Sequence, residues 1–271
     1  MTPAQDPEFG ALTRKISQAR GISCESYKNK CFRRRLAVRM RARGVHTYHA
    51  YARLLDEDAT EYDRLLDTLT INVTKFWRNA ETWAALAAYL RELWQAREGR
   101  VRVWSAGCAS GEEPYSLAVA LAETARHQGQ ERWLDRPRID ATDIDRESIA
   151  RTETAAFPAS AFGEIPGELA ARYFSATEPR QPVDRLRAML RVLRHDLTTE
   201  PPPAAPYDLI VCRNVMIYFE RPLQERLFAA FANALVPNGI LVLGKVETLF
   251  GEGRQRFKME EPRERIYRRL E

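Results

Sequence analysis

The chain has 271 residues, 45% of them hydrophobic, and a formal net charge of +5. This length and hydrophobic content allow one or two domains with a substantial core. No apolar run is long enough to span a bilayer and no signal-peptide pattern opens the chain, so we expect a cytoplasmic protein. The four cysteines form no CxxC pair, which argues against zinc or another metal and against disulfides.

Helical spacing of hydrophobic side chains runs through the first third of the chain, from about Pro7 to Arg97. Its clearest example is Phe32, Leu36 and Met40, which recur at i, i+4 and i+8. We therefore predict a small all-helical N-terminal domain over residues 1–80.

The composition changes after Gly99 to short apolar runs that alternate with helical patterns. These runs, interpreted as strands, are residues 101–105, 138–142, 207–212 and 239–244. Strands that alternate with helices predict a parallel sheet, so we expect an α/β domain over residues 81–271. Asn79 is a candidate cap for the helix that leads into this domain.

The most informative stretch joins the first strand to the next helix. Gly107 and Gly111 interrupt the apolar run, and an amphipathic helical pattern begins at Ser116. Glycines let the backbone approach a ligand and a helix N-terminus offers unpaired N–H groups, which is typical of a cofactor-binding strand–helix unit. Glu112 and Glu113 on the turn disfavour phosphate, so S-adenosylmethionine fits better than a dinucleotide.

Polar side chains follow the second and third strands, at the edge of a parallel sheet where ligands bind. Asp143 is a candidate ligand for ribose hydroxyls, and Asp145 is the better candidate to cap the following helix. Arg213 and Asn214 are candidate ligand contacts after the third strand. Tyr218, a little further on, is equally consistent with core packing.

Several motifs in one order make the pattern specific. They are TxNVTxFxR from Thr70, WSAGCxSGEEPYS from Trp104, TDID from Thr142, DLIVCRNVxIYF from Asp208, and a strand that closes in Gly244-Lys245-Val246-Glu247. Together they resemble the CheR family of chemotaxis receptor methyltransferases, from about Ile22 to Tyr267. The resemblance implies a Rossmann-like, S-adenosylmethionine-dependent enzyme that methylates glutamate side chains of chemoreceptors and forms γ-methyl esters for sensory adaptation.

The resemblance also implies roles for individual residues. Arg78 and Tyr218 would form the methyl-transfer site. Glu113 would meet the amino-acid part of the cofactor, Asp143 its ribose, and Asp196 with Leu197 its adenine. The complete set of implied cofactor-binding residues is Asn72, Thr74, Arg78, Ala106, Glu113, Asp143, Asp196, Leu197, Cys212, Arg213 and Asn214.

A basic segment lies between Lys28 and Arg43, with eight basic residues and no acidic one. A solvated helix with an inward apolar stripe explains part of this pattern. The charge also suits docking of the acidic cytoplasmic helices of methyl-accepting chemoreceptors. Nucleic acid is a rival partner, but no aromatic platform or nucleic-acid module accompanies the segment. We expect a monomer without membrane insertion, whose candidate docking residues are Arg34, Arg35, Arg39, Arg41 and Arg43.

Some members of the family carry a small β-subdomain that binds a pentapeptide at the receptor tail. The corresponding region here, about residues 173–195, contains the short, glycine-free stretch from Ser175 to Pro182. We therefore predict a reduced subdomain and an enzyme that works without the pentapeptide. For Arg185 to Arg194 the pattern does not decide between a helix and strands.

The residues also bear on two alternative functions. A nucleic-acid methyltransferase is disfavoured, because Arg213-Asn214-Val215 stands where an N-P-P-Y or D-P-P-Y signature is expected. A regulator that binds the cofactor without turnover is disfavoured by the intact Arg78 and Tyr218.

Overall fold

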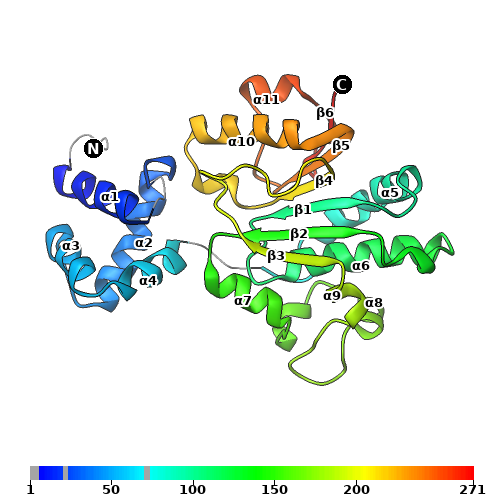
Figure 1. Ribbon diagram of the computed structural model, residues 1–271, viewed down its shortest axis with the longest axis horizontal. Helices are drawn as coiled ribbons and strands as arrows, with labels where there is room; N and C mark the ends of the chain where they lie inside the picture. Colours follow the sequence, from blue (N-terminus) through cyan, green and yellow to red (C-terminus); the bar gives the residue numbers. More distant parts are fainter. Residues whose placement is uncertain (1–5, 21–23, 70–73) are drawn as a thin grey trace. The chain divides into compact units, whose positions relative to one another are not determined.

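The computed structural model describes residues 6–20, 24–69 and 74–271. The chain forms two compact units (Figure 1). Unit 1 comprises residues 1–71, 198–200 and 218–224, and unit 2 comprises residues 72–197, 201–217 and 225–271. Within the described ranges, no helix combines the length and apolar character needed to cross a membrane.

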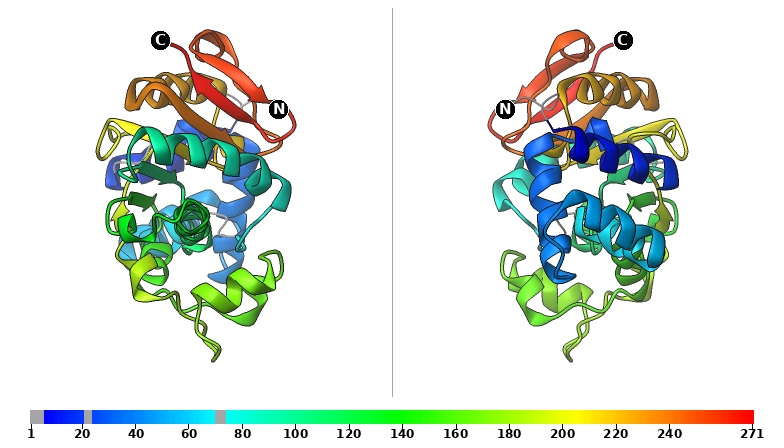
Figure 2. Two further views of the ribbon diagram at one scale, coloured as in Figure 1. Left: turned by 90° about the vertical axis from the view of Figure 1, so that its right-hand side faces the viewer. Right: turned by 90° about the vertical axis from the view of Figure 1, so that its left-hand side faces the viewer.

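The N-terminal part of unit 1 is helical, as predicted (Figure 2, blue to cyan). Its elements are α1 (Pro7–Arg20), the 3-10 turn η2 (Cys24–Ser26), α2 (Asn29–Ala42), α3 (Tyr48–Glu57) and α4 (Thr60–Leu69). Helix α2 ends just before Gly44, whose positive φ of +66° is unfavourable for residues with a side chain. Phe32 and Leu36 are buried, and α2 packs against α4 while α1 packs against α3.

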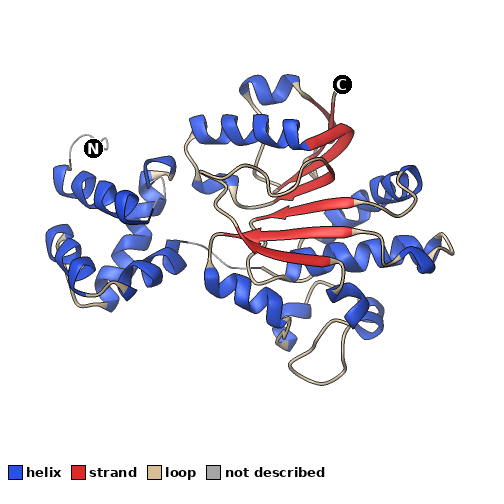
Figure 3. Cartoon of the chain, viewed as in Figure 1, coloured by secondary structure: helices blue, strands red, loops and turns tan. Residues whose placement is uncertain are grey.

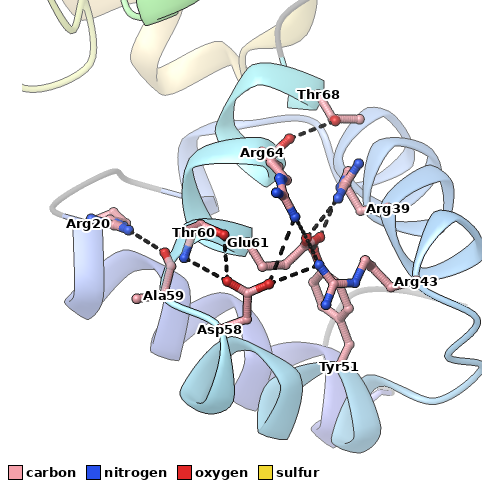
Figure 4. A network of polar contacts seen from close by, with 10 residues as sticks. All are labelled: Arg20, Arg39, Arg43, Tyr51, Asp58, Ala59, Thr60, Glu61, Arg64 and Thr68. Carbon is pink, nitrogen blue, oxygen red and sulfur yellow. Dashed lines mark hydrogen bonds and ion pairs between the residues drawn. The ribbon is translucent and has the colours of Figure 1, made fainter.

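A buried carboxylate joins three of these helices (Figure 4). Both oxygens of Glu61 in α4 accept hydrogen bonds from Arg39 of α2, at 2.9 and 2.7 Å. The Tyr51 hydroxyl of α3 donates to the same carboxylate at 2.8 Å, and Arg43 donates at 3.2 Å. Burial by itself raises the pKa of Glu61, but the hydrogen bonds from Arg39 and Tyr51 outweigh burial and lower it.

Unit 2 contains a seven-stranded sheet in the order β3-β2-β1-β4-β5-β7-β6 (Figures 1 and 3). Five of its strands pair in parallel, whereas β7 and β6 are antiparallel. The strands are β1 (Arg102–Ala106), β2 (Arg138–Asp143), β3 (Leu190–Arg194), β4 (Tyr207–Cys212), β5 (Leu235–Leu243), β6 (Phe257–Glu261) and β7 (Ile266–Arg269). The predicted α/β sheet with a preceding all-helical part is therefore confirmed.

Helices cover the sheet, which explains why every residue of β4 is buried. Helix α6 packs against α5, α9 and β2, and α7 packs against β2 and β3. The helical elements of unit 2 and of its links to unit 1 are α5 (Ala80–Ala96), α6 (Glu112–His127), η3 (Glu131–Trp133), α7 (Arg146–Thr154), η4 (Ala159–Phe162), α8 (Gly167–Tyr173), α9 (Asp184–Arg187), η5 (Met216–Tyr218), α10 (Arg221–Ala234) and α11 (Gly251–Gln255).

The starts of two helices differ from the predictions. Helix α6 begins at Glu112 rather than Ser116, because acidic side chains favour a first helical turn and Pro114 needs no N–H partner there. Asn79 occupies the N-cap position of α5, but its φ is +63° and its side chain makes no capping hydrogen bond. Asp145 caps α7 as predicted, accepting from the backbone N–H groups of Glu147 and Ser148.

The region predicted as a reduced subdomain divides between two structures. Residues 174–182 form a short loop with isolated bridges, one from Phe157 to Arg180 and one from Phe174 to Pro182. The stretch that the pattern left undecided is helix α9 followed by β3, which pairs with β2 in the main sheet.

The first prediction concerns Glu61. Replacing Glu61 by glutamine leaves Arg39 without its carboxylate and Arg43 with Asp58 alone, and removing one partner of a buried pair costs about 3–5 kcal/mol. We expect faster hydrogen exchange of the α2 and α4 amides in the full chain at neutral pH. Because the pKa of Glu61 is lowered from 4.5, this stabilisation is complete above about pH 4.5 and is lost as the pH falls through the lowered value.

Glu57→Gln is the matched control, because Glu57 is an exposed carboxylate on α3. Equal exchange rates in the two variants would show that the Glu61 network contributes little to the stability of unit 1.

Candidate active site

The carboxyl ends of four parallel strands bring the predicted residues of unit 2 to one edge of the sheet. Ala106 ends β1 opposite Thr142, and Asp143 ends β2 opposite Arg194. Strand β4 ends at Cys212, so Arg213 follows at the same edge. Strand β1 is flanked by β2, then β3, on one side and by β4 on the other. The strand order therefore reverses beside β1, and open α/β sheets bind ligands at such a switch point.

The glycine turn after β1 requires residues without a side chain. The φ of Gly107 is +85°, and a Cβ atom there would lie 2.4 Å from Cγ2 of Val215. The N–H groups of Gly107 and Cys108 both donate to the Thr142 carbonyl at 2.8 Å. The backbone turn is thus held against β2 and the segment after β4, which is the close approach expected of a ligand-binding turn.

Glu113 is a largely buried carboxylate, with 12% of its side chain exposed, and its charge is weakly compensated. It accepts a hydrogen bond from the Ser105 hydroxyl at 2.9 Å, and a guanidinium nitrogen of Arg213 lies 3.6 Å away. Burial raises the pKa of Glu113 to about 7, even though the charges of Arg213 and Arg78 act to lower it. A cationic group of a ligand would supply the compensation that the protein leaves incomplete.

Asp143 is held rigidly at the end of β2. One of its oxygens accepts from the N–H of Ala109 at 2.9 Å, and the other accepts from the N–H of Asp145 at 3.0 Å. Burial raises the pKa of Asp143, and the two backbone hydrogen bonds oppose that rise. The backbone N–H of His195 donates to the Asp143 carbonyl at 2.9 Å, which keeps the Asp196-Leu197 segment beside it.

Arg213 links the end of β4 to the segment before α5. Its guanidinium donates to the Arg78 carbonyl at 2.9 Å and to the Asn79 side chain at 2.8 Å. Its Nε atom is buried and has no hydrogen-bond partner among the described residues. Burial lowers the pKa of Arg213, so a ligand carboxylate at this position would restore part of the lost solvation.

The segment that carries Thr74 and Arg78 is anchored by aromatic side chains. Phe76 is fully buried and its ring stacks on Phe162 with centroids 4.7 Å apart. The backbone N–H of Trp77 also donates to the Ser116 hydroxyl at 3.0 Å. Thr74 and Arg78, one on each side of this anchor, are half-buried.

Glu247 is a residue whose role the sequence analysis missed. Its buried carboxylate accepts from the N–H groups of Gly244 at 2.6 Å, Asn214 at 2.9 Å and Ile217 at 3.2 Å. These hydrogen bonds fix the loop after β4, including Asn214 at a positive φ of +61°. An acidic residue just past the last parallel strand was the signal that could have identified it.

The remaining predicted cofactor residues are placed as follows. Asp196 and Cys212 are buried, and Leu197 is half-buried. Asn72 lies outside the described residues. Of the predicted catalytic pair, Tyr218 belongs to unit 1 and Arg78 belongs to unit 2.

The predicted docking arginines of α2 have different surroundings. Arg39 and Arg43 are half-buried and are paired with Glu61, and Arg43 also lies 2.9 Å from Asp58 (Figure 4). Arg34 and Arg41 are exposed. Arg35 is half-buried and lines a small pocket with Tyr218.

A parallel sheet with a glycine turn, a buried carboxylate after it and an aspartate after the second strand is typical of the Rossmann-like methyltransferase class. A family model described as "CheR methyltransferase, SAM binding domain" matches residues 72–266, and one described as "CheR methyltransferase, all-alpha domain" matches residues 7–70. The chain belongs to the CheR methyltransferase family, and it is an enzyme that uses S-adenosylmethionine.

Curated relatives agree with this assignment. The chain is 32% identical over 253 residues to a chemotaxis protein methyltransferase of Klebsiella aerogenes, covering 90% of this chain and 84% of that protein. It is 31% identical over 266 residues to the protein of the same name in Escherichia coli K12, covering 94% and 88%. Among solved structures, a TehB-like SAM-dependent methyltransferase from Corynebacterium glutamicum is 18% identical with a TM-score of 0.38, covering 70% of this chain and 93% of that one.

The second prediction concerns the raised pKa of Glu113. A carboxylate of pKa about 7 is partly protonated near neutral pH, and it would have to ionise to bind a cationic group such as an ammonium. We expect the affinity for S-adenosylmethionine to fall by up to about tenfold per pH unit as the pH is lowered from 7 to 5.5. Calorimetric titrations across this range measure the slope.

The Glu113→Gln variant should bind more weakly and lose this slope. Glu112→Gln is the matched control, since Glu112 is the neighbouring buried carboxylate and hydrogen-bonds with the Ser110 hydroxyl instead. An unchanged slope in Glu113→Gln would assign the proton to another group.

Proposed function

We propose that this enzyme transfers a methyl group from S-adenosylmethionine to glutamate side chains of chemoreceptors, forming γ-methyl esters that serve sensory adaptation. The family match over residues 72–266 carries this proposal, together with relatives named as chemotaxis protein methyltransferases. We further propose that the enzyme acts in the cytoplasm as a monomer.

The chemistry of the sheet edge supports a specific arrangement of the cofactor. The Glu113 carboxylate would bind its ammonium group and the guanidinium group of Arg213 would bind its carboxylate, while Arg78 would line the methionine end of the cofactor next to the methyl-transfer site. Asp143 would accept from the ribose hydroxyls, since each of its oxygens keeps a free lone pair after one backbone hydrogen bond. The other residues proposed around the cofactor are Asn72, Thr74, Ala106, Asp196, Leu197, Cys212 and Asn214.

The reaction needs little acid–base equipment. The bound cofactor supplies an electrophilic methyl group, and a glutamate substrate of ordinary pKa about 4.3 is already ionised near pH 7. No residue therefore has to remove a proton from the substrate. The protein contributes alignment of the carboxylate with the methyl group and exclusion of water. Arg78 would hold one substrate oxygen while the other attacks, and Tyr218 would contact the methyl group.

Receptor docking is proposed on the exposed side of α2. Lys30, Arg34 and Arg41 are exposed and recur at i, i+4 and i+11, so they lie on one helical face. An acidic receptor helix would be attracted to this face, most strongly at low salt. The ion pairs of Arg39 and Arg43 with Glu61 are internal to unit 1, so their contribution to docking would be indirect. The short 174–182 loop supports recognition without the receptor-tail pentapeptide.

The third prediction is the direct test of the reaction. Labelled methyl from S-adenosylmethionine should be transferred to a chemoreceptor cytoplasmic fragment, and brief alkaline treatment should release it as methanol, because carboxyl esters are base-labile. In Arg78→Ala we expect transfer to fall by about 100-fold or more, since misalignment is costly, while cofactor affinity changes only modestly.

Lys75→Ala is the control, because it removes an exposed positive charge from the same segment. Alkali-stable label would rule out a glutamate ester as the product. Full activity of Arg78→Ala would show that Arg78 has no role in transfer.

The fourth prediction tests receptor recognition. Reversing the charge of the exposed arginines, with Arg34→Glu and Arg41→Glu together, should raise the KM for the receptor fragment by about tenfold at low salt and leave kcat unchanged. Arg53→Glu on α3 is the control, because Arg53 is exposed on a different helix. Fragments with and without the C-terminal tail should give the same KM, and a lower KM with the tail would contradict independence from the pentapeptide.

A further inference from the structure

The segment that contains Tyr218 pairs with the backbone just before α2, inside unit 1. The Lys28 N–H donates to the Tyr218 carbonyl at 2.8 Å, and the Glu220 N–H donates to the Ser26 carbonyl at 2.8 Å. Between these two hydrogen bonds, Tyr27 and Phe219 face each other in an antiparallel bridge. Residues 26–28 and 218–220 therefore form a short two-stranded contact, here named the 27–219 bridge.

The position of Tyr27 and Phe219 in the bridge brings their side chains together. The hydrogen bonds flank the pair rather than join it, and such non-hydrogen-bonded pairs have the closer Cα atoms and side chains. The two rings meet edge to face with centroids 5.2 Å apart, and Phe219 is buried. The Tyr27 ring also lies 6.3 Å from the ring of Phe32, a buried residue of α2.

The 27–219 bridge adjoins the start of the helix proposed to dock the receptor. Lys28 is the N-cap of α2, so the residue that hydrogen-bonds to Tyr218 immediately precedes the helix. One turn further along α2, Cys31 and Arg35 line a pocket with Tyr27, Phe32 and Tyr218. The exposed Lys30 and Arg34 lie on the same two turns of α2.

We propose that Tyr27 is a positioning residue that holds Tyr218 in a fixed place relative to the docking helix. The proposal rests on the proposed function, because it takes Tyr218 as the residue at the transferred methyl group. A receptor helix bound on α2 is then presented at a fixed distance from Tyr218. Ring packing of Tyr27 on Phe219 and Phe32 maintains this distance.

Loosening the 27–219 bridge should affect turnover more than binding. The exposed charges of α2 remain when Tyr27 is shortened, so a receptor still docks and KM is preserved. Tyr218 gains freedom relative to the bound substrate, and a misplacement of about 1 Å costs on the order of 100-fold in rate. The signature of positioning is thus a fall in kcat with an unchanged KM for the receptor.

The fifth prediction uses the full chain and a receptor fragment in the methanol-release assay. Tyr27→Ala should lower kcat by about 10- to 100-fold, with the KM for the fragment and the affinity for S-adenosylmethionine within about twofold of wild type. Tyr27→Phe keeps the ring and should retain wild-type kcat. Hydrogen exchange at Lys28 and Glu220 should accelerate in Tyr27→Ala and not in Tyr27→Phe.

A second variant separates positioning from substrate contact, because Tyr27 also lines the pocket. Tyr27→Cys with Phe219→Cys, in a chain that also carries Cys31→Ser, removes both rings. Non-hydrogen-bonded pairs have Cα atoms about 4.5 Å apart, within the range that a disulfide spans. Reduced, this variant should have low kcat. Oxidised, with the disulfide verified by mass spectrometry, it should recover at least tenfold.

Each of these results in Tyr27→Ala or in the double-cysteine variant would overturn the proposal: wild-type kcat in Tyr27→Ala, a loss confined to KM, or a verified disulfide that restores no activity. Loss of activity in Tyr27→Phe would show that the hydroxyl, rather than ring packing, is required, and this result would also overturn the proposal. Failure of the proposed function looks different, since wild-type enzyme would then release no methanol from any receptor fragment.

Discussion

Three largely buried carboxylates at one edge of a parallel sheet impose the main constraint on unit 2. Burial raises the pKa of Glu113, Asp143 and Glu247, so each must be compensated or become neutral. Asp143 and Glu247 are compensated by backbone N–H groups, and their hydrogen bonds fix the loops after β1 and β4. Glu113 receives a hydrogen bond from Ser105 and a more distant charge from Arg213. The incomplete compensation of Glu113 would favour a cationic ligand group at this edge.

The arginines of α2 serve two physical purposes that look alike in sequence. Arg39 and Arg43 neutralise the buried Glu61 and thereby join α2 to α4. Arg34 and Arg41 point into solvent and give the unit an exposed positive face. The internal ion pairs hold α2 against α4, so the exposed charges lie on a helix that is fixed to its neighbour.

Unit 1 is completed by a segment distant in sequence. Residues 218–224 come after β4, yet they cluster with the N-terminal helices through the backbone hydrogen bonds of Lys28 and Glu220. Tyr218 therefore shares a unit with α2, while the loop that leads to it is held by Glu247 in unit 2.

The sequence by itself determined the class of sheet, the helical N-terminal part and the family, because these depend on hydrophobic periodicity and on motifs that are local in the chain. Asp145 was identified as a cap for the same reason, since capping involves neighbours three residues apart. The short strands β6 and β7 escaped prediction, and β3 was left undecided between a helix and strands, because charged residues interrupt or end their short apolar runs. Tertiary structure alone decided the partners of Arg39, Arg213 and Glu247, because hydrogen bonds between distant segments leave no periodic trace in the sequence.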